Sequence, residues 1–151
     1  MLKRTAVPAL ALAFAFSACG GDDGGPSKAE FIEEADAICA DASDRAEELA
    51  RAGFSDPQNP TPDEVLAIVE QLIPLQRETT ADVRALDKPE DEEDEIDNLL
   101  NQADTATDRA EQEIDTPQEA VAVVQASDTP QDPFYEVNQA FAEYGFEDCS
   151  E

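Results

Sequence analysis

The feature of this sequence that most constrains its fold is a helix-start signal that occurs three times. A serine or threonine is followed three positions later by glutamate at Ser27-Lys28-Ala29-Glu30, Thr61-Pro62-Asp63-Glu64 and Thr116-Pro117-Gln118-Glu119. In this capping box the hydroxyl accepts from the backbone of the glutamate, whose side chain reaches back to the first residue. Proline at the first helical position suits the same device. Helices are therefore predicted to begin at these three places, and two more at Pro89 and at Asp132-Pro133.

Apolar residues recur at intervals of three and four after each of these starts. That spacing places them on one face of an α-helix, and no segment alternates with period two for long enough to predict a strand. Three long and two short helices joined by short turns predict an all-α antiparallel helical bundle over residues 28–151. The predicted core stripes are Phe31, Ala35, Ile38, Ala42 and Leu49; Val65, Ile68, Val69, Leu72, Leu75, Thr79, Val83 and Leu86; Ile96, Leu99, Leu100, Ala103, Ala106, Ala110 and Ile114; Ala120, Val121, Val123 and Val124; and Phe134, Val137, Phe141 and Tyr144.

Glycine and proline mark the interruptions of this pattern. Gly53 and Gly145 follow apolar stripes and are predicted helix ends. Pro74 lies inside the second stripe, where it removes one backbone hydrogen bond. Because the stripe continues in phase beyond it, we expect a kink and not an end. Such a kink would splay two helices and open an apolar pocket beside Ile73 and Leu75.

The first nineteen residues have the order of an export signal. Lys3 and Arg4 precede an apolar run over residues 6–16, and two small residues precede Cys19. The stretch over residues 16–19 resembles the lipobox of bacterial lipoproteins, with Phe16 where leucine is usual. The resemblance implies a signal peptide over residues 1–18, a lipidated Cys19 that begins a flexible tether over residues 19–27, and a cell-membrane location on the extracytoplasmic face. The alternative is an ordinary signal peptide with a cysteine nearby.

The charge of the chain excludes several classes of partner. The formal net charge is −28, and removal of Lys3 and Arg4 leaves seven basic against 37 acidic residues, a charge of −30. Such a surface repels nucleic acid, whose binding needs basic residues against phosphates. It also repels anionic headgroups, so the membrane contact is expected to come from the lipid on Cys19 alone. The oligomeric state is left open.

Two cysteines remain once Cys19 is lipidated. An even pair in an exported domain indicates a disulfide, so Cys39 and Cys149 are predicted to be bridged. The alternative is two free thiols that serve as a redox or metal pair.

The two ends of the domain carry a resemblance of their own. The start over residues 27–32 and 35–39 (SKAEFI, ADAIC) and the end over residues 144–149 (YGFEDC) resemble a group of small actinobacterial helical lipoproteins. The group is uncharacterised in function. The resemblance implies a Cys-bridged helical lipoprotein, and it brings no activity.

The residues available for chemistry are few. The chain has no histidine, the usual base for a serine or cysteine nucleophile and a common zinc ligand. We therefore expect no enzyme and no cofactor, and a non-enzymatic lipoprotein that binds an envelope protein or a small apolar ligand. The alternative is weak Ca²⁺ binding by an acidic run, although carboxylates on a helix start radiate around its axis and are more simply solvated. The candidate ligands are Glu90, Asp91, Glu93, Asp94 and Asp97.

Overall fold

The computed structural model describes residues 25–127 and 129–150. It contains α1 (Lys28–Gly53), α2 (Pro62–Arg84), α3 (Glu93–Glu113), α4 (Pro117–Ala126), α5 (Tyr135–Tyr144) and a short 3₁₀ helix, η1 (Asp148–Ser150). No strand occurs within these residues. The expected signal peptide and the lipidation site at Cys19 lie outside the described residues.

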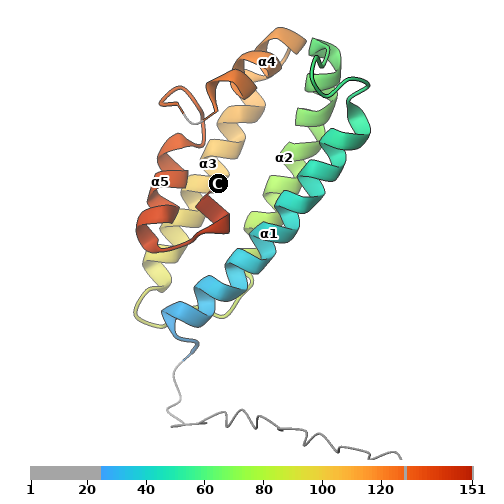
Figure 1. Ribbon diagram of the computed structural model, residues 1–151. Coiled ribbons are helices and arrows are strands. Elements are labelled where there is room, and N and C mark those ends of the chain that lie inside the picture. Colours follow the sequence, from blue (N-terminus) through green and yellow to red (C-terminus); the bar gives the residue numbers. More distant parts are fainter. Residues whose placement is uncertain (1–24, 128, 151) are drawn as a thin grey trace, which may run out of the picture.

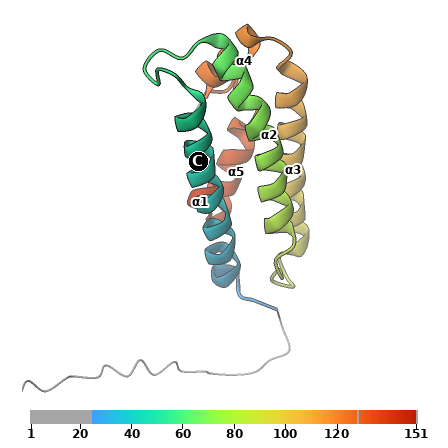
Figure 2. The same cartoon turned by 90° about the vertical axis from the view of Figure 1, so that its right-hand side faces the viewer.

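The helices form the predicted antiparallel bundle. α1, α2 and α3 run up, down and up, α4 lies across the end opposite the start of α1, and α5 returns beside α3 (Figures 1 and 2). α1 packs on α2, α2 packs on both α3 and α4, and η1 packs on α1 and α5. The C-terminal segment, residues 145–150, therefore crosses from α5 to α1, the first helix of the chain.

The capping signals begin their helices where the sequence predicts. Ser27 and Thr61 form complete capping boxes with Glu30 and Glu64 at the starts of α1 and α2, and Thr116 accepts from the amide of Glu119 at the start of α4. At the other ends, Gly145 terminates α5 in the left-handed conformation, with a φ of 119°. Gly53 is the last residue of α1, and its cap is Phe54, one residue later than predicted.

The predicted start of the third helix at Pro89 is wrong by four residues. Pro89 accepts a turn hydrogen bond from the amide of Glu92 at 3.0 Å, and α3 begins only at Glu93. Glu92 has side-chain partners outside its own segment: it accepts from the Tyr144 hydroxyl at 2.5 Å and pairs with Lys28 at 3.2 Å. These contacts join the starts of α1 and α3 to the end of α5. The last helix begins at Tyr135, three residues after Asp132, whose side chain accepts from the amide of Phe134 at 2.9 Å.

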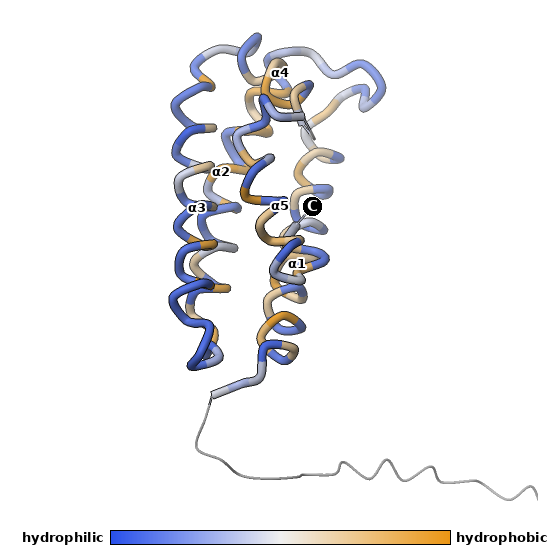
Figure 3. The backbone as a smooth tube through the Cα atoms, turned by 90° about the vertical axis from the view of Figure 1, so that its left-hand side faces the viewer, coloured by the Kyte–Doolittle hydropathy of each residue, from blue (hydrophilic) through white to orange (hydrophobic). Residues whose placement is uncertain are grey.

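The core consists of an aromatic cluster near the start of α1 and a long aliphatic face of α3. Near the start of α1, Phe146 lies edge-on to Phe31 and Phe141 and stacks on Tyr144, and all four are buried. The predicted face of α3 is buried along most of its length, with a predominantly polar outer side (Figure 3). The buried members of that face are Ile96, Leu99, Leu100, Ala103, Ala106 and Ala110, together with Thr107.

The predicted stripe of α1 is only partly buried. Phe31 and Ala35 are fully buried, whereas Ile38, Ala42 and Leu49 remain partly exposed. The second half of α1 is therefore less covered than its apolar spacing predicts.

α2 continues through Pro74 from Pro62 to Arg84, as predicted. Pro74 itself is exposed, whereas its neighbour Leu75 is buried. Within the described residues, no helix combines the length and apolarity needed to span a bilayer.

Candidate ligand-binding site

A cavity of about 400 Å³ lies among the helices and is open on one side. α1 and α2 supply one wall of the cavity, and α5 with the C-terminal segment supplies the opposite wall. α3 lies behind the cavity and also lines it. Val123 and Val124 of α4 line the cavity as well. α4 lies at the end of the bundle opposite the start of α1 (Figure 1). Cys39 and Cys149 line it where the C-terminal segment reaches α1.

Side-chain size explains why the space is there. Toward the start of α1, the aromatic cluster around Phe146 fills the gap between α1 and α5. Beyond Cys39, the residues that α1 turns to the cavity are Ala42, Ser43 and Ala46. These side chains are too short to reach the opposite wall, so this part of the bundle stays hollow.

The lining is mainly apolar. Ile73 and Leu75 flank Pro74 and both line the cavity, so the structure places an apolar space where the proline predicts one. Two buried threonines of the lining direct their hydroxyls to their own helices: Thr79 donates to Leu75 at 2.9 Å and Thr107 donates to Ala103 at 2.9 Å. The remaining apolar members of the lining are Ala42, Ala46, Val69, Leu72, Ala103, Ala110, Ile114, Val123, Val124, Phe134, Val137 and Phe141.

The predicted Cys39–Cys149 disulfide is present. The two sulfurs lie 1.99 Å apart and join residues separated by 110 positions. The alternative of two free thiols is therefore wrong for this structure. The bridge holds the C-terminal segment against α1 and closes one end of the cavity.

A set of hydrogen bonds beside the disulfide also joins the C-terminal segment to α1, and it was not predicted from the sequence. The Asp36 carboxylate accepts from the backbone amides of Glu147, Asp148 and Cys149 at 3.0–3.2 Å. It thereby caps η1, whose free amides point toward it. The available signal was an acidic residue one helical turn before Cys39, on the half-buried side of α1.

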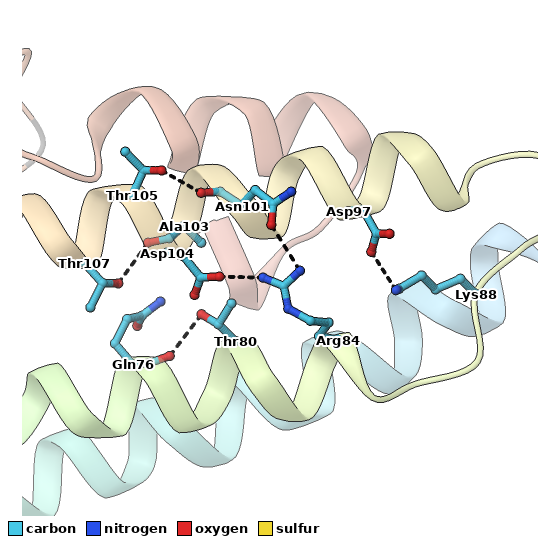
Figure 4. A network of polar contacts seen from close by, with 10 residues as sticks. All are labelled: Gln76, Thr80, Arg84, Lys88, Asp97, Asn101, Ala103, Asp104, Thr105 and Thr107. Atoms are coloured by element: carbon cyan, nitrogen blue, oxygen red, sulfur yellow. Dashed lines mark hydrogen bonds and ion pairs between the residues drawn. The ribbon is translucent and has the colours of Figure 1, made fainter.

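The structure does not assemble the acidic run into a cation site. Glu90 and Asp91 lie in the turn before α3, Glu93 and Asp94 lie in its first turn, and Asp97 pairs with Lys88 at 2.7 Å (Figure 4). Within the described residues, no group of three or more acidic, cysteine or histidine side chains is arranged to hold a metal ion.

Every basic side chain in the described part of the chain lies in an ion pair. Between α2 and α3, Arg84 binds Asp104 at 2.6 Å and Asn101 at 3.3 Å (Figure 4). Between α1 and α2, Arg45 binds both oxygens of Glu78, and this contact lowers the pKa of that carboxyl. The other pairs are Lys28–Glu92, Arg51–Glu47, Arg77–Asp108 and Arg77–Glu111, Lys88–Asp97, and Arg109–Glu113.

Several pKa values are shifted at helix starts and where the start of α1 meets the end of α5. Hydrogen bonds from Ser55 and Thr61 lower the pKa of Glu64 to about 2. Burial and the contact with Glu92 raise the pKa of Tyr144, and the Tyr144 hydroxyl in turn lowers the pKa of Glu92. None of these groups lines the cavity, so the shifts belong to structural contacts.

Comparison with known protein families, characterised proteins and solved structures finds no match.

Proposed function

We propose that this chain is an exported lipoprotein whose helical domain binds a small apolar ligand in the cavity between α1 and α5. The observation that carries the proposal is the cavity itself. Its volume of about 400 Å³ falls within the roughly 300–1,000 Å³ of small-molecule pockets. Its walls are mainly aliphatic and aromatic, as ligand pockets usually are.

A binding role is favoured over catalysis by the side chains available. The chain has no histidine. Cys39 and Cys149 are joined in a disulfide, which removes them as nucleophiles. Acyl-transfer and metal-assisted chemistry would therefore lack their usual groups in this cavity.

The membrane attachment belongs to the same proposal and rests on the sequence alone. A diacylglycerol on Cys19 would hold the acidic domain at a surface that its own charge disfavours. Substitution Cys19→Ala should move the protein from the membrane fraction to the soluble fraction, or stop processing of the precursor. Unchanged retention of processed protein in the membrane would contradict lipidation.

Ligand binding can be tested by filling the cavity. Ala42 lines it from α1, and Ala37 lies exposed on the same helix outside it. The chain has no tryptophan, so each of Ala42→Trp and Ala37→Trp also introduces a unique fluorophore. We expect Ala42→Trp to emit at shorter wavelength and to weaken binding of a neutral alkyl probe, dodecyl maltoside, by at least about tenfold, or about 1.4 kcal/mol.

Ala37→Trp should bind the probe as the unaltered protein does. Calorimetric titration of the full chain below the micelle concentration would measure both affinities. Equal affinity in the two variants, or no binding to the unaltered protein, would refute a ligand-binding cavity at this place.

A further inference from the structure

We infer that the cavity selects an amphiphile with a positively charged head group, an inference that rests on the proposed function and specifies its ligand. The argument starts from what the cavity lacks. Among the described residues that line it, no side chain is basic. All seven lysines and arginines of the described chain are engaged in ion pairs with carboxylates.

An anionic head group would find no positive charge in the lining, whose other side-chain donors are the neutral Ser43, Gln76, Ser127 and Asn138. Carboxylates and phosphates are bound in proteins by arginine, lysine or converging N–H and O–H groups. The hydroxyls of Thr79 and Thr107 already donate to carbonyls of their own helices. Binding a carboxylate here would therefore take a charged group out of water without an opposite charge to pair with it, which is costly.

The two charged side chains of the lining are both acidic, and they belong to the segments that precede and follow α5. Asp132 precedes α5, and Asp148 lies in the C-terminal segment that crosses to α1. Phe134, whose amide donates to Asp132, lines the cavity on the same side. Carboxylates and aromatic rings in one lining suit a substituted ammonium group, because both kinds of group attract a cation.

The opposite wall suits the apolar part of the same molecule. Leu72 and Ile73 of α2 and Ala46 of α1 face the cavity there. An alkyl chain would contact this wall while its head group lies toward Asp132 and Asp148. The excess negative charge of the whole domain would add long-range attraction for a cation.

The test compares three probes that share one chain and differ in head-group charge. These are dodecyltrimethylammonium, dodecyl maltoside and dodecanoate, each titrated into the full chain below its micelle concentration. Titration near 0.15 M salt screens remote charges, because the Debye length is then about 8 Å. We expect one site, with the ammonium probe bound at least about tenfold more tightly than the maltoside, and dodecanoate bound most weakly.

Two double variants separate the local carboxylates from the overall charge. Asp132→Asn/Asp148→Asn removes both acidic groups of the lining, and asparagine at position 132 can still accept from the amide of Phe134. Glu33→Gln/Glu34→Gln removes two exposed charges on α1 outside the cavity. The ammonium preference should fall by at least about threefold in the first variant and stay unchanged in the second.

The outcomes distinguish this inference from the function on which it rests. Equal binding of the three probes, all weakened by Ala42→Trp, would overturn charge selection and leave the binding function standing. An equal loss of preference in both double variants would also overturn it, because overall charge would then explain the selection. Absence of binding by all three probes, or binding insensitive to Ala42→Trp, would refute the cavity as a site altogether.

Discussion

At the scale of single residues, Asp36 joins the two ends of the domain. Its carboxylate accepts hydrogen bonds from the three backbone amides of residues 147–149, directly beside the Cys39–Cys149 bridge. A carboxylate that caps a helix start satisfies amides that would otherwise need water. The C-terminal segment is therefore held by both a covalent and an electrostatic contact, and it forms part of the cavity wall.

Replacing Asp36 should loosen this segment without unfolding the bundle. We expect Asp36→Ala to reduce the free energy of unfolding by about 1 kcal/mol, as for loss of a helix cap. Amide hydrogen exchange at Glu147, Asp148 and Cys149 should accelerate, because these amides lose their acceptor. Asp36→Asn keeps one acceptor oxygen and should have an intermediate effect. Unchanged exchange at these three amides in Asp36→Ala would contradict the capping role.

Glu64 makes the stability of the start of α2 depend on pH. Hydrogen bonds from Ser55 and Thr61 favour the charged carboxylate and lower its pKa from 4.5 to about 2. A lowered pKa means that this contribution is fully present above about pH 4.5 and is lost as the pH falls through about 2.

The corresponding variant is Glu64→Gln. The difference in Tm between the unaltered protein and Glu64→Gln should be largest above pH 5 and should shrink steadily between pH 4.5 and 2. Glu70→Gln, an exposed change on the same helix, controls for the loss of one charge. A carbon NMR titration should place the midpoint of Glu64 near 2, and a midpoint near 4.5 would show that the capping contacts are absent.

At the scale of elements, the helices that could be predicted from the sequence are those whose start signals are local. Ser27, Thr61 and Thr116 each form their contacts within four residues, so their helices begin where the pattern places them. The start of α3 could not be predicted in this way. Glu92 is held by Tyr144 and Lys28, partners 52 and 64 residues away in the chain, and the helix begins after it.

The same distinction applies to the candidate site. Pro74 and the apolar residues on either side of it indicated an apolar space, and the cysteine count indicated the bridge that closes one end of it. The extent of the cavity was not predictable, because it depends on how far the short side chains of α1 stand from α5. The spacing of apolar residues indicates which face of a helix points inward, but it does not indicate whether other side chains fill the space against that face.

The variant Pro74→Ala tests whether this proline shapes the cavity at the expense of stability. A proline inside a helix removes a backbone hydrogen bond and costs about 3 kcal/mol, part of which is offset by its stiffening of the unfolded chain. Pro74 is exposed, so Pro74→Ala loses little packing. We expect it to raise the free energy of unfolding by about 2 kcal/mol. It should also weaken binding of dodecyl maltoside, because Ile73 and Leu75 line the cavity on either side of position 74 and should shift when the helix gains the missing hydrogen bond.

Pro62→Ala is the matched control, because Pro62 lies in the first turn of α2, where proline is well tolerated. This variant should change the free energy of unfolding by less than about 0.5 kcal/mol and leave binding unaltered. Denaturant unfolding and titration of both variants would decide the matter. A stabilised Pro74→Ala protein with full affinity would show that the proline does not shape the cavity.

At the scale of the whole molecule, the distribution of charge sets the dependence of stability on salt. Each basic side chain of the described chain already has a carboxylate partner, and the nine basic residues of the full sequence are too few to balance the charge of its 37 acidic residues. Repulsion among them favours expansion, and dissolved salt screens it. The ion pairs are mostly exposed and individually weak, so their screening should cost less than the repulsion that is relieved.

Stability should therefore rise with ionic strength. Raising NaCl from about 0.01 M to about 0.15 M shortens the Debye length from about 30 Å to about 8 Å, and Tm should increase by several degrees. CaCl₂ at equal ionic strength tests the acidic run before α3 at the same time. Because the structure does not gather Glu90, Asp91, Glu93, Asp94 and Asp97 into a site, Ca²⁺ at low millimolar concentration should stabilise no more than general screening predicts. A saturable rise in Tm with Ca²⁺, absent with NaCl and lost on replacing Glu93 and Asp94 by their amides, would instead establish cation binding at the start of α3.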